Sequence, residues 1–73
     1  MEYTLLNSTS EVDEFLADSK KALRIGDTIG IIVSENIVEQ VPSIAMKYGF
    51  AIIDGEDTED GMIKLLLEYR HLR

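Results

Sequence analysis

Three consecutive hydroxyl side chains, Ser8, Thr9 and Ser10, are the residues best suited to bind a ligand. They stand just before a helical pattern, and the free N–H groups and dipole at a helix N-terminus attract anions. Asn36 follows a later strand, and we expect it at the same end of the sheet if the two strands are parallel neighbours. We therefore predict a ligand-binding site at these four residues. Helix capping is the simpler alternative, because the acidic residues after Ser10 would repel an anion.

A second group of polar side chains is the acidic segment that ends at Gly61. Five carboxylates fall within the seven residues 54–60, and carboxylate oxygens are ligands that Ca²⁺ prefers. The spacing differs from that of an EF-hand, because the closing bidentate position would fall on Leu67. We therefore predict no metal site and interpret the segment as a solvated hairpin tip. Four of its carboxylates are candidates for docking a basic partner: Glu56, Asp57, Glu59 and Asp60.

The chain lacks most of the side chains that carry out catalysis. It contains no cysteine, which excludes a thiolate nucleophile, a disulfide and thiolate metal ligands. We expect its single histidine, His71, to be a solvated tail residue, because no second ligand or carboxylate is fixed beside it. We therefore predict no catalytic residue and no cofactor, and we favour a protein that is not an enzyme.

Length and charge narrow the class of protein. Seventy-three residues make one domain, residues 1–73, near the lower size at which a core is stable without disulfides or metals. Fourteen acidic and seven basic residues give a net charge of −7, which argues against nucleic acid as a partner. No apolar run reaches the roughly 18–20 residues of a membrane span, and Met1–Thr4 lacks the pattern of a secretion signal. We expect a cytoplasmic location without membrane contact, which fits the absence of cysteine.

Hydrophobic periodicity predicts the elements that must position these residues. A first strand is expected over Glu2–Asn7. A helix follows, opened by Ser10 and Asp13 in a hydroxyl-x-x-carboxylate pattern. Its apolar face continues to Leu23, and Gly26 is the expected stop.

The rest of the chain predicts three strands and a second helix. Gly30 within the second strand indicates a bulge or the close approach of a helix. Pro42 suits the first turn of the second helix, and the pattern leaves open whether Ile37–Gln40 is a separate turn or the start of that helix. The predicted segments are the strand Thr28–Ser34, the helix Val41–Tyr48, the strand Phe50–Asp54, the hairpin loop Gly55–Gly61, the strand Met62–Tyr69 and the tail Arg70–Arg73.

Two helices and four strands predict an α/β (α+β) fold. We expect a two-layer sandwich in the order β-α-β-α-β-β, with a four-stranded mixed sheet and both helices on one face. The other face is then open, and we expect Ile32, Met62 and Leu66 to lie on it. A protein partner or a second copy of the chain, forming a homodimer, would cover these side chains.

The segment Gly26–Asn36 resembles a recurrent piece of the TusA/SirA family of small sulfur carriers. In that family a glycine-acid pair leads into an apolar strand that ends in short polar residues, as in this segment. The likeness continues in Lys20–Leu23 of the first helix, in Val41 and Pro42 at the start of the second, and in Gly49 before the third strand. The resemblance implies the TusA/SirA-like sandwich for most of the chain.

The likeness fails at the residue that carries the family's chemistry. Members of the family have a Cys-Pro pair between the first strand and the first helix, and the cysteine holds the transferred sulfur as a persulfide. The corresponding region here is Asn7–Glu11, which has neither residue, and a hydroxyl does not form a persulfide. We therefore expect a cysteine-less relative that acts as a non-catalytic protein-binding or accessory module, with a vestigial site at the hydroxyls. The alternative is a role in sulfur transfer in which a partner supplies the reactive cysteine.

Overall fold

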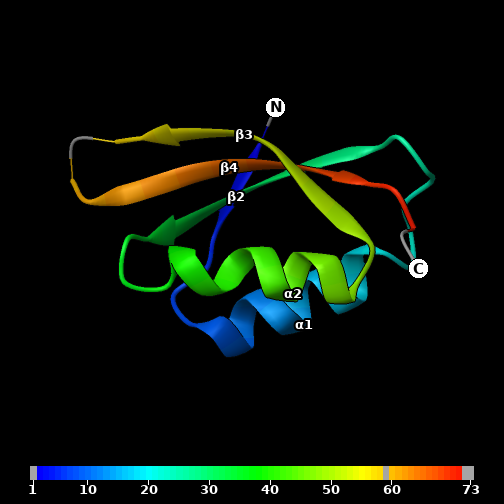
Figure 1. The fold of residues 1–73 in the computed structure, drawn as a ribbon, viewed down its shortest axis with the longest axis horizontal. Helices are drawn as coiled ribbons and strands as arrows, with labels where there is room; N and C mark the ends of the chain where they lie inside the picture. Colours follow the sequence, from blue (N-terminus) through cyan, green and yellow to red (C-terminus); the bar gives the residue numbers. More distant parts are fainter. Residues whose placement is uncertain (1, 59, 72–73) are drawn as a thin grey trace.

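The computed structural model describes residues 2–58 and 60–71 and consists of two layers. A sheet forms one layer, and a pair of helices covers one of its faces (Figure 1). The elements are β1 (Tyr3–Leu5), α1 (Thr9–Ser19), β2 (Thr28–Ser34), the 3₁₀ turn η1 (Val38–Gln40), α2 (Val41–Lys47), β3 (Phe50–Asp57) and β4 (Met62–Tyr69). The predicted α+β sandwich and its β-α-β-α-β-β order are confirmed. The segment before Pro42 is a separate 3₁₀ turn, which settles the question that the sequence left open.

The four strands form one mixed sheet in the order β1-β2-β4-β3. The strand β1 runs parallel to β2, whereas β4 is antiparallel to both of its neighbours, β2 and β3. Consequently β2 and β3 run in the same direction with β4 inserted between them. Parallel strands require a crossover connection, and α1 and α2 provide the two crossovers that return the chain to the sheet.

The first helix begins two residues earlier than the sequence pattern predicts. Its N-cap is Ser8, whose Oγ accepts a hydrogen bond from the Glu11 N–H at 3.2 Å. The Glu11 Oε1 atom in turn accepts one from the Asn7 N–H at 3.1 Å. The Ser8 bond is one half of a capping box, whereas the Glu11 carboxylate binds the N–H of Asn7, the residue before the N-cap, and not that of Ser8. The predicted pair of Ser10 and Asp13 was wrong, because the Asp13 carboxylate bonds instead to the second helix.

The first helix also ends earlier, at Ser19 rather than near Leu23. The next residues form tight turns, in which the Lys21 N–H donates to the Asp18 carbonyl at 3.2 Å. Gly26 was predicted to end the helix, but the helix ends seven residues before it, at Ser19. With φ of +98°, Gly26 forms the turn into β2, where its N–H donates to the Tyr69 carbonyl at 2.8 Å. Leu23 still packs against the core from this irregular segment.

The third strand continues to Asp57 instead of ending at Asp54, and the first strand is shorter than predicted. A bulge at Ile53 shifts the register, so that Ile52 pairs with Leu67 and Asp54 with Leu66. Glycine and carboxylates weaken the strand signal in the sequence. They are tolerated here because β3 is an edge strand with solvent on one side.

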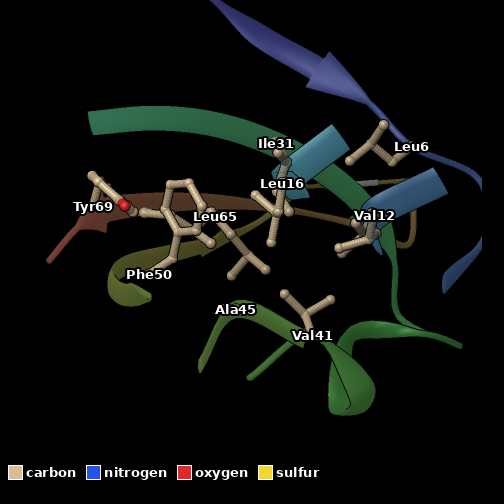
Figure 2. Close-up of a cluster of buried hydrophobic side chains, with 11 residues drawn as sticks. Leu6, Val12, Leu16, Ile31, Val41, Ala45, Phe50, Leu65 and Tyr69 are labelled. Carbon is tan, nitrogen blue, oxygen red and sulfur yellow. The ribbon is translucent and has the colours of Figure 1, made fainter. Parts of the chain in front are cut away.

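The core is apolar and lies between the two helices and one face of the sheet (Figure 2). In β4, Leu65, Leu67 and Tyr69 are buried on the helix-covered face, and they alternate with Leu66, which was predicted on the opposite face. The Tyr69 ring packs against Phe50 with 5.2 Å between the ring centroids. The other buried apolar residues are Leu6, Val12, Leu16, Ile31, Val33, Val41 and Ala45.

Among the described residues, no helix has the length and apolar character needed to cross a membrane.

We predict that Leu16→Ala lowers the free energy of unfolding by about 2–5 kcal/mol, because it leaves a cavity in the centre of the core. Leu5→Ala removes the same atoms from an exposed position and is expected to change it by about 1 kcal/mol or less. Urea unfolding followed by circular dichroism measures both values. Equal losses in the two variants would contradict the assignment of Leu16 to the core.

Candidate functional site

The three hydroxyls lie where β1 passes into α1, but they do not act together. The Ser8 hydroxyl accepts a hydrogen bond from the Glu11 N–H and thereby caps the N-terminus of α1. Thr9 and Ser10 line a shallow hollow of about 370 Å³ together with Asp13, Glu14 and Ile44. Two of these lining residues carry carboxylates, and Glu11 already faces the helix N-terminus. The hollow is therefore poorly suited to an anion.

Asn36 occupies the expected end of the sheet, because β1 and β2 are parallel neighbours. Its backbone N–H donates to the Ser34 hydroxyl at 3.0 Å in a turn after β2. Within residues 2–58 and 60–71, no side-chain hydrogen bond joins Asn36 to Ser8, Thr9 or Ser10. Asn36 does not line the hollow beside α1 either. The structure thus places the four residues at one end of the sheet, and a ligand site among them stays a prediction.

A polar cluster that the sequence did not reveal ties α1 to α2. The Asp13 carboxylate accepts hydrogen bonds from the Tyr48 hydroxyl and, at 3.0 Å, from the Lys47 ammonium. The Tyr48 hydrogen bond, followed by the Lys47 contact, lowers the pKa of Asp13 below its ordinary value. The same carboxylate raises the pKa of Lys47. The Lys20 ammonium lies 5.5 Å from the centre of the Tyr48 ring.

This cluster is a structural contact between the two helices. Its members are exposed or only partly buried, and the charges of Asp13 and Lys47 pair with each other at 3.0 Å. Asp13 is separated from Lys47 by 34 positions, so no local spacing signals the contact. The sequence pattern instead assigned Asp13 to the predicted capping pair with Ser10.

The acidic segment is divided between a strand and a turn. Glu56 and Asp57 belong to β3, and all the described carboxylates of the segment are exposed. In the turn, the Thr58 N–H and hydroxyl each lie 2.9 Å from the Met62 carbonyl oxygen. The Thr58 hydroxyl also bonds to the Asp60 carboxylate and lowers the pKa of Asp60. The predicted docking residue Glu59 lies outside the described residues.

The described side chains contain no metal-binding arrangement. In residues 2–58 and 60–71, no three carboxylate or imidazole groups come together as metal ligands would. The imidazole of His71 is exposed, and its Nδ1 atom lies 2.9 Å from the Tyr69 hydroxyl.

The sheet face opposite the helices carries an apolar patch, which we call the open face: Tyr3, Leu5, Ile32, Met62 and Leu66. Register places these residues together, because paired residues in neighbouring strands point to the same side. Leu5 and Tyr3 are 52% and 36% exposed, and the others are partly exposed. The predicted positions of Ile32, Met62 and Leu66 on this face agree with the register.

Gly30 is explained by Tyr3 rather than by a bulge or a helix. A Cβ atom on Gly30 would lie 2.6 Å from the Tyr3 ring, so the ring rests directly on the glycine backbone. The Lys64 ammonium lies 5.4 Å from the centre of the same ring. The open face therefore has an aromatic side chain flanked by a cation at its β1 edge.

Compared with known proteins, the chain matches no protein-family model, and no curated protein gives a significant match.

We predict that Ser8→Ala lowers the free energy of unfolding by about 1 kcal/mol, because the first turn of α1 loses its cap. Ser10→Ala is the matched control and is expected to have little effect, since Ser10 lies inside the helix and alanine favours helix. Chemical unfolding of both variants tests this. A larger loss for Ser10→Ala would instead place the cap at the position that the sequence pattern suggested.

We predict that Asp13→Asn destabilises the protein near neutral pH and that this difference disappears in acid. The pKa of Asp13 is lower in the folded than in the unfolded protein, where it is near 3.8. The charged carboxylate therefore stabilises the fold when the pH is above the unfolded-state pKa. This stabilisation is lost as the pH falls through the folded-state pKa. Asp18→Asn is the control, because its ion pair with Lys21 spans 3.8 Å between exposed side chains. Urea unfolding from about pH 7 to about pH 3 measures the effect. A difference that is constant over this range would contradict it.

Proposed function

We propose that this chain is a small, non-catalytic protein-binding module that docks a basic protein partner on its open face. The observation that carries the proposal is the apolar patch on the sheet face without helices, where Leu5 is 52% exposed. An apolar centre beside charged residues is the arrangement found at many protein interfaces.

The distribution of charge supports a basic partner. Asp54 and Glu56 of β3 pair with Leu66 and Lys64, so their side chains lie on the same side of the sheet as the apolar patch. Neither forms an ion pair with another described residue. Two copies of a chain with a net charge of −7 repel each other, whereas a basic surface is attracted. These features support a basic partner over a second copy of the chain.

The proposal includes descent from TusA/SirA-like proteins and a cytoplasmic location. The order β-α-β-α-β-β and the one-sided helix layer support the relationship, and the absence of cysteine supports a reducing compartment. A fold alone does not determine an activity. Because the Ser8 hydroxyl caps a helix at the place of the family's cysteine, we assign partner binding and no sulfur transfer to this chain.

A matched pair of substitutions on an affinity-tagged protein tests the proposal. Leu5→Lys places a charge in the open face, whereas Ile25→Lys makes the same change at a 70% exposed residue in the turn before β2. We expect a basic protein from native cell extract to be retained by the wild type and by Ile25→Lys, and to be lost with Leu5→Lys. Both variants change the net charge equally, so a general electrostatic effect would weaken them alike.

Two results would contradict the proposal. One is a partner that both variants retain as well as the wild type does. The other is a stable dimer of the wild-type chain at micromolar concentration that Leu5→Lys dissociates, measured by sedimentation. The second result would make the open face an interface between two copies.

A further inference from the structure

Resting on the proposed function, we infer how the partner binds: an extended segment of it adds as a new strand to the edge of β3. In this arrangement an apolar side chain of the segment enters a groove between β3 and α2, and basic side chains lie along the acidic half of β3. Strand addition of this kind obtains affinity from backbone hydrogen bonds and specificity from alternate side chains.

The edge of β3 is long enough for such pairing. The strand has eight residues, and within residues 2–58 and 60–71 β4 is its only neighbour in the sheet. One side of its backbone is therefore without a strand partner among the described residues. The opposite edge of the sheet, β1, has only three residues and offers much less backbone for pairing.

A groove beside the first half of β3 suits an apolar side chain. It has a volume of about 420 Å³, and Met46 on its rim is 68% exposed. Successive side chains of a strand point to opposite faces of the sheet. Every second side chain of an added strand would therefore turn toward the helix layer, where this groove lies. The groove is lined by Pro42, Ala45 and Met46 of α2 and by Phe50, Ala51 and Ile52 of β3.

The second half of β3 determines the charge of the added strand. Beyond the bulge at Ile53, the strand presents the exposed carboxylates of Asp54, Glu56 and Asp57, none of which forms an ion pair with a described residue. Parallel pairing of β3 with β3 of a second copy would bring these carboxylates close together. Charges on an edge strand oppose such self-pairing, and here they favour a basic strand instead.

A synthetic peptide of about ten residues, long enough for one strand, is the direct probe. One half contains valine and leucine, and the other half alternates lysine with threonine. The same residues in the reverse order form a second peptide, because the added strand can run in either direction. Titration of the ¹⁵N-labelled full chain, followed by NMR, is expected to shift the amide signals of residues 50–57 and of the neighbouring part of α2.

Methylated peptides test whether the backbone pairs. Alternate amides of an added strand point toward β3, and a methyl group on these amides prevents their hydrogen bonds. We expect methylation of one alternating set to abolish binding and methylation of the other set to preserve it. Equal effects of the two sets would overturn strand addition, because contacts through side chains alone do not depend on which amides are blocked.

Protein variants with equal net charge test the acidic half. The double variant Glu56→Lys, Asp57→Lys is expected to weaken peptide binding about tenfold. The double variant Glu14→Lys, Glu39→Lys makes the same change in charge at exposed sites away from β3 and is expected to retain most of the affinity. Met46→Lys, at the groove rim, is also expected to weaken binding. Circular dichroism confirms that each variant is folded before its affinity is compared.

The outcomes separate this inference from the proposed function. Shifts confined to Tyr3, Leu5 and Ile32 would overturn strand addition while leaving the open face as the docking surface. No binding of either peptide at millimolar concentration would also overturn strand addition, and the capture experiment with Leu5→Lys would still decide the proposed function. Loss of partner capture with Glu56→Lys, Asp57→Lys but not with Leu5→Lys would support the edge and contradict the open face.

Discussion

The rest of the structure depends on the packing of two helices against one face of the β2–β4 pair. The side chains at the centre of this contact are apolar and fully buried, as Ile31, Leu67 and Leu16 illustrate. No polar or charged side chain is buried among the described residues. Burial of apolar surface is therefore the main source of stability. Because this contact uses only one face of the sheet, the second face stays open. The strand order β1-β2-β4-β3 places β3 at one edge.

This arrangement explains where the polar chemistry of the chain lies. Those carboxylates and hydroxyls of the sequence analysis that the structure describes are at the periphery, where they cap a helix, join two helices or border the sheet. A general acid or base requires an environment that moves its pKa toward neutrality. At Asp13 and Asp60 hydrogen bonds lower the pKa instead, which keeps both groups charged. These pKa directions are consistent with the partner recognition that we propose.

The predictions from sequence are wrong at positions where the local residue pattern fits two different structures equally well. Ser8 and Ser10 both precede an acidic residue at the capping distance, and the competing contact of Asp13 with Tyr48 decides between them. Residues 55–57 have the composition of a loop, yet they pair with β4 across the bulge at Ile53. In both cases the deciding contact joins residues that are distant along the chain or across a hairpin. Local patterns carry no information about such contacts.

The sequence by itself determined the number and order of the strands and α-helices and which side of β4 is buried, because periods of two and of 3.6 residues are local properties. It also determined the net charge and the absence of any cysteine that could carry a persulfide. Only the tertiary structure decided that β4 lies between β2 and β3 and that Tyr3 rests on Gly30. The apolar groove beside the acidic edge of β3 is likewise a product of tertiary packing. These features depend on contacts between distant segments, whose geometry is set by the common core.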